Sequence, residues 1–215
     1  EVRRRFLDIM VCDIDNSHQK RLINYQKLLK ERIKLLQKYQ NPPTVWLSSV
    51  EEKIAQFGVL IAASRNRLAQ YLNDIATGLD SIFLKSEIKI LGEVEQALLQ
   101  DKALDVERLF IKKLQEGRES ALYSGRTNFG VHLSDLTSIS KKNNLEAKFC
   151  STGEQKSMLI SIILSRIELL KFLIPQASLI LLLDEIASHL DENKLFGLLQ
   201  EIKKTNIQCL ITGVS

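Results

Sequence analysis

The first third of the chain carries apolar residues at spacings of three and four, which is typical of amphipathic helices. In residues 17–39 they form one stripe, made of Leu22, Tyr25, Leu28, Leu29, Ile33, Leu36 and Tyr39. Pro42 and Pro43 end this pattern, because proline cannot continue the helical hydrogen-bond ladder. A second stripe begins near Thr44 and continues to Ile75. Two long helices joined by so short a break are predicted to pack antiparallel.

The rest of the chain changes from helical spacing to a mixed pattern. Helices are predicted over 79–99 and 103–122, with Asp101 as a candidate N-cap. After Ser124 and Gly125 the apolar period becomes two, which predicts strands at 127–136 and 147–149. A helix is predicted over 154–173, a strand buried on both faces at 178–183, a helix capped by Asp191 and a last strand at 207–212. A helical part followed by an α/β half is the simplest organisation.

Composition supports a mostly helical globular protein. Of 215 residues, 45% are hydrophobic and only 9 are Gly and 3 Pro, which argues against disorder and against repetitive fibrous chains. No apolar run reaches the length of a membrane span, so no membrane association is expected. The three cysteines, Cys12, Cys150 and Cys209, are far apart and fit a reducing cytoplasm. The histidines (His18, His132 and His189) have no partners at zinc-ligand spacing.

The formal net charge of +4 is concentrated near the N-terminus, where residues 1–40 hold 10 Lys or Arg against 5 Asp or Glu. A basic helix can follow a phosphate backbone by releasing counterions, so Lys27, Lys30 and Lys34 are candidate DNA-binding residues. Lysine is also the usual residue at exposed helix positions. On charge alone, a solvated helix face is the simpler interpretation.

The densest chemical signal lies in the last third. The apolar run 179–183 ends in Asp184 and Glu185, and a buried parallel strand delivers such acids to the ligand-binding edge of its sheet. One carboxylate can hold Mg²⁺, and its neighbour can orient or deprotonate a water molecule. Ser151-Thr152-Gly153-Glu154-Gln155 directly precedes a predicted helix, whose N-terminus favours anions. An ordinary N-cap at Ser151 or Thr152 explains that segment equally well.

These segments together resemble known nucleotide-binding motifs. Residues 151–155 resemble the signature motif of ABC-type ATPases, residues 179–185 the Walker B strand, and Ser188-His189-Leu190-Asp191 the D-loop. Three segments are similar in sequence to the RecF family. They are Arg3-Arg4-Arg5-Phe6-Leu7-Asp8, Gly125-Arg126-Thr127 and Ser151-Thr152-Gly153-Glu154-Gln155-Lys156. This family of bacterial DNA-repair ATPases is related to the SMC proteins.

The resemblance implies a fold of class α/β plus α. It would be the C-terminal half of an ABC-type ATPase head with an inserted antiparallel helical lever arm. Residues 1–12 would be a remnant of the head, 13–122 the lever arm, and 123–215 the head with its three motifs. Members of the family form ATP-dependent homodimers that bind gapped DNA and, with RecO and RecR, help load RecA. Roles in replication and the SOS response are implied as well.

The resemblance also implies roles for single residues. Ser151 and Gly153 would contact the γ-phosphate of ATP held by the partner subunit, and Thr152, Glu154 and Gln155 would belong to the same nucleotide-binding signature segment. Asp184 would serve Mg²⁺ and Glu185 the hydrolytic water, while Ser188 and Asp191 would communicate across the dimer.

The sequence also departs from the family pattern. It contains no G-x-x-x-x-G-K-[ST], the Walker A loop that lies upstream of this region in the family, so truncation is expected. A chain without that loop is predicted neither to hold ATP tightly nor to hydrolyse it alone. Val131 and Leu133 stand where the family normally has Pro and Arg, which weakens any phosphate or DNA role for that stretch.

Two other interpretations remain. The chain could be a non-enzymatic docking module whose long helical pair binds proteins, with the α/β part only a degenerate support. A transporter ATPase subunit fits less well, because the helical insert is too long. Trp46 is predicted to be a core anchor of the helical arm rather than a base-stacking platform.

Overall fold

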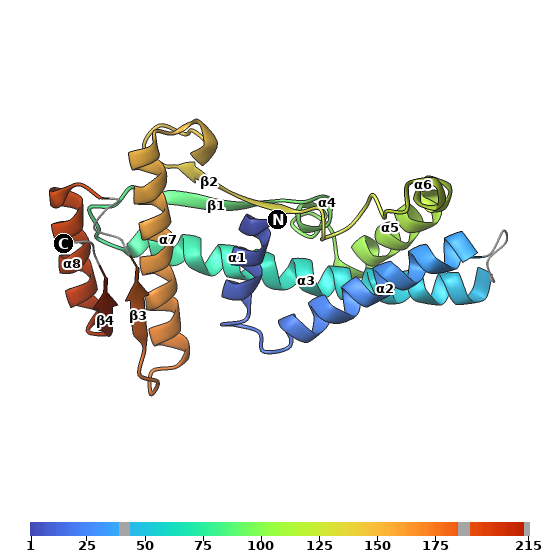
Figure 1. Ribbon diagram of the computed structural model, residues 1–215, viewed down its shortest axis with the longest axis horizontal. Helices are drawn as coiled ribbons and strands as arrows, with labels where there is room; N and C mark the ends of the chain where they lie inside the picture. The colour runs from blue at the N-terminus through green and yellow to red at the C-terminus, as the bar shows by residue number, and fades with distance from the viewer. Residues whose placement is uncertain (39–43, 185–189, 213–215) are drawn as a thin grey trace. The chain divides into compact units, whose positions relative to one another are not determined.

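The computed structural model describes residues 1–38, 44–184 and 190–212 (Figure 1). The chain divides into two compact units. Unit 1 comprises Glu1–Ala69 and Ile90–Leu136, and unit 2 comprises Gln70–Lys89 and Thr137–Ser215. Because α3 (Thr44–Gly78), β1 (Ser86–Leu91) and β2 (Asp135–Ser140) each contribute residues to both units, the division does not follow the predicted boundaries at 12 and 122, which stay a prediction.

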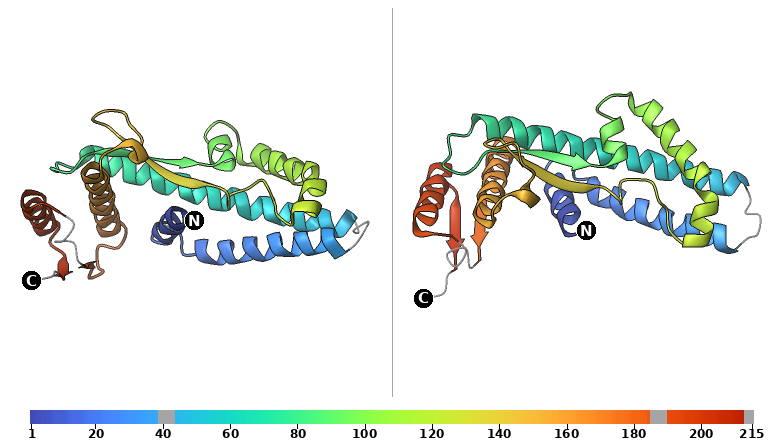
Figure 2. Two further views of the ribbon diagram at one scale, coloured as in Figure 1. Left: turned by 45° about the horizontal axis from the view of Figure 1, so that its top comes forward. Right: turned by 90° about the horizontal axis from the view of Figure 1, so that it is seen from above.

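Unit 1 is helical. It contains α1 (Val2–Val11), α2 (His18–Lys38), the first part of α3, α4 (Glu93–Ala97), α5 (Ala103–Glu116) and α6 (Arg118–Ser124). Helices α2 and α3 run antiparallel, as predicted (Figures 1 and 2). Two contacts fix this direction, because Asp15 before α2 accepts from Ser64 while Arg32 farther along α2 pairs with Glu51. The core between the helices includes Tyr25, Leu47, Ile54, Phe110 and Leu114.

Unit 2 contains a small parallel sheet and two helices. Strands β3 (Ile180–Leu183) and β4 (Gln208–Ile211) pair in parallel, with Leu183 opposite Ile211. Helices α7 (Thr152–Leu173) and α8 (Glu192–Thr205) pack together over a core of Phe83, Ile160, Leu164, Ile167, Leu198 and Ile202. Both strands and both helices lie where the sequence predicts them. The expected burial of the first strand on two faces is wrong, since Ile180 is 56% and Leu182 70% exposed.

Several other sequence predictions are wrong. Residues 79–99 are not one helix: they hold β1, in which Ser86, Ile88 and Ile90 are buried, and the short α4. β1 pairs with β2 in a second two-stranded sheet. Residues 147–149 form a 3₁₀ turn, and the N-cap of α5 is Lys102 rather than Asp101.

The predicted strand 127–136 fails for a backbone reason, because Gly130 has φ +130, which a regular strand residue does not adopt. Phe129 packs edge-on against Phe110, with ring centroids 4.9 Å apart. Only Asp135 and Leu136 of this segment belong to β2. Trp46 is also not the predicted core anchor, since it is 47% exposed in the first turn of α3. Among the described residues, no helix is long and apolar enough to cross a membrane.

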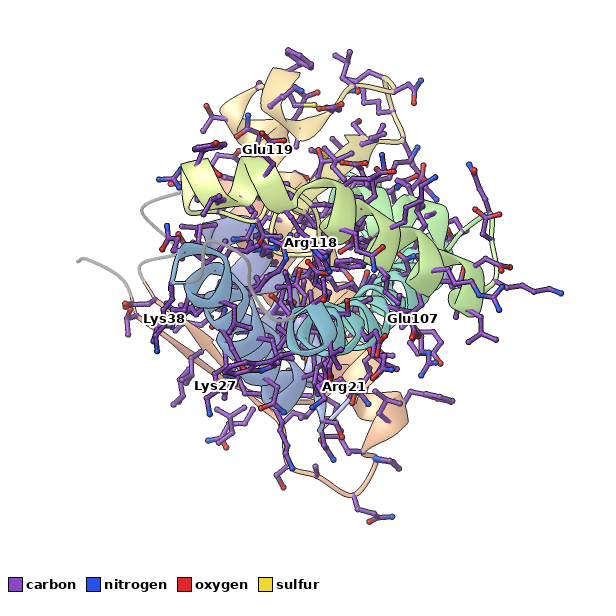
Figure 3. All side chains as sticks on the ribbon, turned by 90° about the vertical axis from the view of Figure 1, so that its right-hand side faces the viewer. Arg21, Lys27, Lys38, Glu107, Arg118 and Glu119 are labelled. Atoms are coloured by element: carbon purple, nitrogen blue, oxygen red, sulfur yellow. The ribbon has the colours of Figure 1, made fainter. Side chains whose placement is uncertain are left out.

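Arg32 and Arg65 are both buried in unit 1, and each pairs with at least one carboxylate. Arg32 of α2 donates from Nε to Glu51 (3.0 Å), from Nη1 to Thr127 Oγ1 (3.1 Å) and from Nη2 to the Leu114 carbonyl (2.6 Å). Arg118 points inward from α6 and donates to the same Glu51 (Figure 3). Arg32 is one of the ten basic residues in residues 1–40, but only 1% of it is exposed, so it is a core residue.

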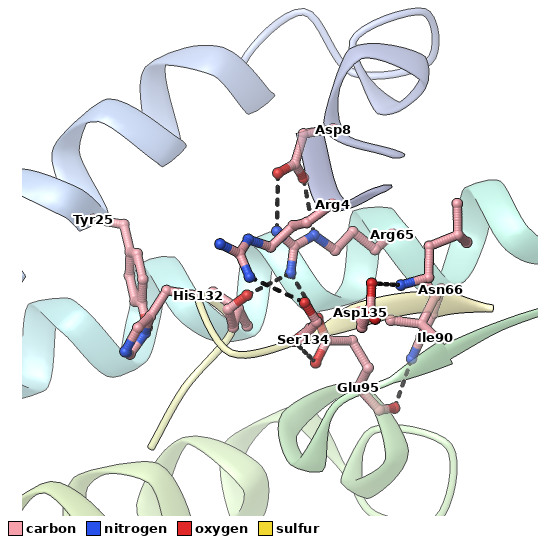
Figure 4. Close-up of polar contacts among 12 residues, drawn as sticks. Arg4, Asp8, Tyr25, Arg65, Asn66, Ile90, Glu95, His132, Ser134 and Asp135 are labelled. Carbon is pink, nitrogen blue, oxygen red and sulfur yellow. Dashed lines mark hydrogen bonds and ion pairs between the residues drawn. The ribbon is translucent and has the colours of Figure 1, made fainter. Parts of the chain in front are cut away.

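Arg65 of α3 is the centre of a larger network (Figure 4). Its Nε and Nη2 donate to the two carboxylate oxygens of Asp8 at 2.9 and 3.0 Å, and its Nη1 donates to Glu95 and to the Val131 carbonyl, both at 2.8 Å. His18 lies 2.9 Å from Asp8, and Ser134 donates to Glu95 at 2.8 Å. One guanidinium therefore joins α1, α3, α4 and the segment before β2.

We expect Arg65→Ala to lower the free energy of unfolding by about 3–5 kcal/mol, because it leaves Asp8 and Glu95 as buried charges without their cation. Urea unfolding followed by circular dichroism measures this loss. Arg67→Ala, at an exposed position of the same helix, is the matched control and is expected to change stability by less than about 0.5 kcal/mol. Equal stability of the two variants would contradict the assignment.

The same variant should change the acid sensitivity of the fold. Burial by itself raises the pKa of Asp8, but the hydrogen bonds from His18 and Arg65 outweigh it, and the pKa lies below its ordinary value. A carboxyl with a lowered pKa stabilises the fold above about pH 4 and loses that contribution as the pH falls through the folded-state pKa. Without Arg65, the decline of stability below about pH 4 is expected to be smaller.

Candidate nucleotide site and DNA-binding surface

The segment that resembles the signature motif forms a capping box at the start of α7. Ser151 is the N-cap, and its hydroxyl oxygen accepts from the Glu154 amide at 3.3 Å. In return, the Glu154 carboxylate accepts from the Ser151 amide at 3.0 Å and from its hydroxyl at 2.9 Å. These hydrogen bonds, that of the backbone first, lower the pKa of Glu154. The amides of Thr152 and Gly153 occupy the first turn, where no intrahelical carbonyl is available to them.

The start of α8 is built in the same way. Asp191 is the predicted N-cap and accepts from the Lys194 amide at 2.9 Å. Its other oxygen lies 3.1 Å from Lys194 Nζ. The same ammonium group faces α7, because a Cβ atom added to Gly153 would lie 3.3 Å from Lys194 Nζ. Lys194 therefore brings the start of α7 and the Asp191 segment together, a contact that sequence analysis missed. The only sequence signal for it was a lysine three residues after a capping aspartate.

Asp184 lies at the carboxyl end of β3, as predicted. Its Oδ1 accepts from the hydroxyl of Thr212 at 2.5 Å, at the end of the neighbouring β4. The parallel register continues past both strands, since the Thr212 amide donates to the Leu183 carbonyl at 2.9 Å. An exposed carboxylate beside a hydroxyl offers the oxygen ligands that Mg²⁺ prefers, so these residues fit the implied ion. No cluster of three His, Cys, Asp or Glu side chains suited to a metal occurs among the described residues.

Glu185 and Ser188, the predicted catalytic and communicating residues, lie outside the described residues, and so does His189. The described part of the chain therefore brings together two of the three motifs. They are the signature-like segment and the end of the D-loop-like segment.

The candidate DNA-binding lysines lie on one exposed face of α2. Lys27, Lys30 and Lys34 are exposed, and none of them has an ion pair among the residues that the structure describes. Figure 3 shows Lys27 and Lys38 extending from the same side of the helix. Arg21, in contrast, is paired with Asp15. The face thus carries lysines, while the nearby arginines make contacts within the protein.

Comparison with known proteins finds relatives that share one name, although no family model matches the chain. The DNA replication and repair protein RecF of Brucella abortus (strain 2308) is 39% identical over 208 residues, covering 93% of this chain and 53% of the relative. The protein of the same name from Mesorhizobium japonicum is 36% identical over 213 residues, covering 98% of this chain and 56% of the relative. The chain is thus similar to RecF proteins over nearly all of its own length.

Solved structures agree with the sequence relatives. A structure described as the recombination mediator protein RecF with ATPrS in the RecFOR pathway matches with a TM-score of 0.82 and 26% identity, over 99% of this chain and 57% of that one. This match confirms the predicted fold class, part of an ABC-type ATPase with a helical arm. The chain spans about half the length of the RecF proteins that it matches.

The segment Gly130–Asp135, where Val131 and Leu133 depart from the RecF pattern, is structural. His132 Nε2 lies 2.8 Å from the Thr127 carbonyl and must donate to it, so Nδ1 accepts from the Tyr25 hydroxyl at 2.9 Å. Burial lowers the pKa of His132, which favours this neutral ring. Val131 is buried and gives its carbonyl to Arg65, whereas Leu133 is 55% exposed. The histidine thus holds the segment against α2, while Asp135 pairs with Arg3.

The capping box gives a direct test of local structure. We expect Ser151→Ala to cost about 1 kcal/mol of stability and to speed hydrogen exchange of the Glu154 amide, because that amide loses its acceptor. Ser151→Asn, which retains a capping oxygen, should keep both near the wild-type values. Hydrogen exchange followed by nuclear magnetic resonance checks this, and unchanged exchange in Ser151→Ala would contradict the capping role.

Proposed function

We propose that this chain is part of an ATP-dependent DNA-binding protein of recombinational repair. In this proposal two subunits close as a clamp on gapped DNA when ATP lies between them, and they help RecO and RecR to load RecA. The observation that carries the proposal is the meeting of the α7 and α8 N-termini at Gly153, Lys194 and Asp191. The names of the relatives, a DNA replication and repair protein and a recombination mediator with bound nucleotide, support it.

The chemistry of the α7 N-terminus suits a phosphate. Amides without intrahelical partners and the positive end of the helix dipole attract an anion. Lys194 adds a full positive charge next to Gly153. Because residues 151–155 resemble a signature motif, the nucleotide is proposed to be held by the second subunit and contacted here by Ser151, Thr152 and Gly153, in the segment that Glu154 and Gln155 complete.

The carboxylates at the end of β3 divide the remaining work. Asp184, held by Thr212, is proposed to bind Mg²⁺, directly or through water, and Glu185 to orient the attacking water. When bound, the ion neutralises charge on the phosphates. Ser188 and Asp191 are proposed to signal between subunits, and the capping of α8 by Asp191 gives that signal a path into the helix.

A protein-docking module is the second candidate, and one observation favours it. Large apolar side chains are exposed in unit 2, including Phe172 at 82%, Leu182 at 70% and Phe196 at 64%. Glu185→Gln, made in a chain restored with its upstream part, separates the two functions. An ATPase subunit that cannot activate water should remain longer in its nucleotide-dependent complex, whereas a docking module should be unaffected.

The nucleotide site is tested with Gly153→Asp. An acid in the first turn suits the helix dipole, so α7 should stay folded, but the carboxylate repels a phosphate. The wild-type chain is expected to associate with full-length Brucella abortus RecF in the presence of ATPγS and not of ADP. Gly153→Asp should abolish this association, measured by analytical ultracentrifugation.

Gly153→Ala is the matched control for that experiment. Its Cβ would meet only the flexible end of Lys194, so it should fold and retain most of the association. Equal association of Gly153→Asp and the wild type would reject the nucleotide role of α7.

The DNA surface is tested by changing Lys27, Lys30 and Lys34 together to Ala. We expect weaker DNA binding and a salt dependence flatter by up to about 2–3 in the slope of log K against log salt, because each lysine removes one phosphate contact. Fluorescence anisotropy at several salt concentrations measures both quantities. The control changes Lys102, Lys112 and Lys203, three exposed lysines on or beside other helices, and should leave the slope unchanged. An unchanged slope in the first variant would reject this surface.

A further inference from the structure

The segment from Gly125 to His132 runs beside α2 in the opposite direction. Three contacts mark its course. A Cβ added at Gly125 would lie 3.3 Å from Gln37 Nε2, Thr127 Oγ1 accepts from Arg32 at 3.1 Å, and His132 accepts from Tyr25 at 2.9 Å. As the residue numbers rise along the segment, those of its contact residues in α2 fall, so the two run antiparallel. Because Arg32 and Tyr25 are buried, this side of the segment is anchored in the core of unit 1.

Two exposed side chains lie at the beginning of this segment, Tyr123 just before it and Arg126 within it. Tyr123, in the last turn of α6, is 81% exposed, so most of its ring surface contacts no other part of the described chain. Arg126 is exposed as well, and its guanidinium has no ion pair among the described residues. The backbone between them is held in place, because Gly125 takes the left-handed conformation (φ +65) and the Arg126 amide donates to the Ser124 hydroxyl oxygen.

The turn between these two side chains approaches the end of the lysine face of α2 at Gln37. Lys30, Lys34 and Gln37 follow one another at spacings of four and three, so they lie in one row along the helix surface. Gln37 is also the residue that Gly125 approaches. The row of Lys30, Lys34 and Gln37 therefore ends beside the turn between Tyr123 and Arg126, and α2 and α6 contact each other.

We propose that Tyr123 stacks on a base of an unpaired DNA strand whose phosphates lie on Arg126, Lys30 and Lys34. This inference rests on the proposed DNA-binding function and adds a preference to it. Lysines alone attract any nucleic acid backbone, because phosphate contacts carry no information about base pairing. An exposed ring beside them can take a base only where that base is free of its duplex. Tyr123 thus directs the surface toward the single-stranded part of a gap.

The test compares Tyr123→Ala with Tyr123→Phe on two probes, a fluorescein-labelled oligo(dT) and a blunt duplex of equal length. Tyr123→Ala is expected to weaken binding of the full chain to oligo(dT) by about tenfold, as base–aromatic stacking typically does. The salt dependence of binding should not change, since no charge is removed. Tyr123→Phe should bind as the wild type does, and duplex affinity should change less than about twofold. Tyr71→Ala, at another exposed tyrosine on α3, is the matched control.

The outcomes separate this inference from the function on which it rests. If Tyr123→Ala binds oligo(dT) as well as Tyr71→Ala does, while the triple lysine variant binds weakly, the stacking role is rejected and the DNA surface stands. An equal loss on oligo(dT) and duplex also rejects stacking. If the triple lysine variant binds both probes like the wild type, the DNA surface itself is wrong.

Discussion

The buried Arg65 guanidinium is the interaction on which unit 1 depends. Asp8 and Glu95 come from helices far apart in the sequence, and both carboxylates pair with this one cation inside the unit. Arg65 also donates a hydrogen bond to the Val131 carbonyl, which the turn around Gly130 would otherwise leave without a donor. The path of the chain from Gly125 to Asp135 is therefore set by buried charge as much as by apolar packing.

The same principle separates core from surface along α2. Arg32 has a planar group with several donors, and it satisfies Glu51, Thr127 and the Leu114 carbonyl together. The lysines of the helix have compact, strongly hydrated charges and remain in solvent. For this reason, a count of basic residues along α2 overstates the positive charge on its surface. What remains outside is a narrower face of lysines, which at its Gln37 end is approached by Gly125.

Much of this architecture follows from the sequence, and the failures have physical causes. The spacing of apolar residues predicted α2, α3, α7 and α8, and Ser151 and Asp191 cap their helices as expected. The alternation in Ser86–Leu91 was visible but lay inside a stretch that also fits helical spacing. Gly130 breaks a plausible strand, and no local pattern reports its φ angle. Lys194 and Arg65 act through contacts between elements, which a single sequence does not reveal.

The capping box ranks the residues proposed to meet a nucleotide. The Ser151 hydroxyl already donates to Glu154, and the Glu154 carboxylate holds the Ser151 amide as well. An arriving phosphate would bring a second negative group close to this carboxylate. The phosphate can therefore accept from the Ser151 hydroxyl only if Glu154 no longer does. The Thr152 and Gly153 amides have no such competitor in the helix, and Lys194 lies beside the latter. Contact should therefore begin at Gly153, and Ser151 should join only after the capping box opens. Because opening would also loosen the first turn of α7, nucleotide contact and a change in that helix would be coupled.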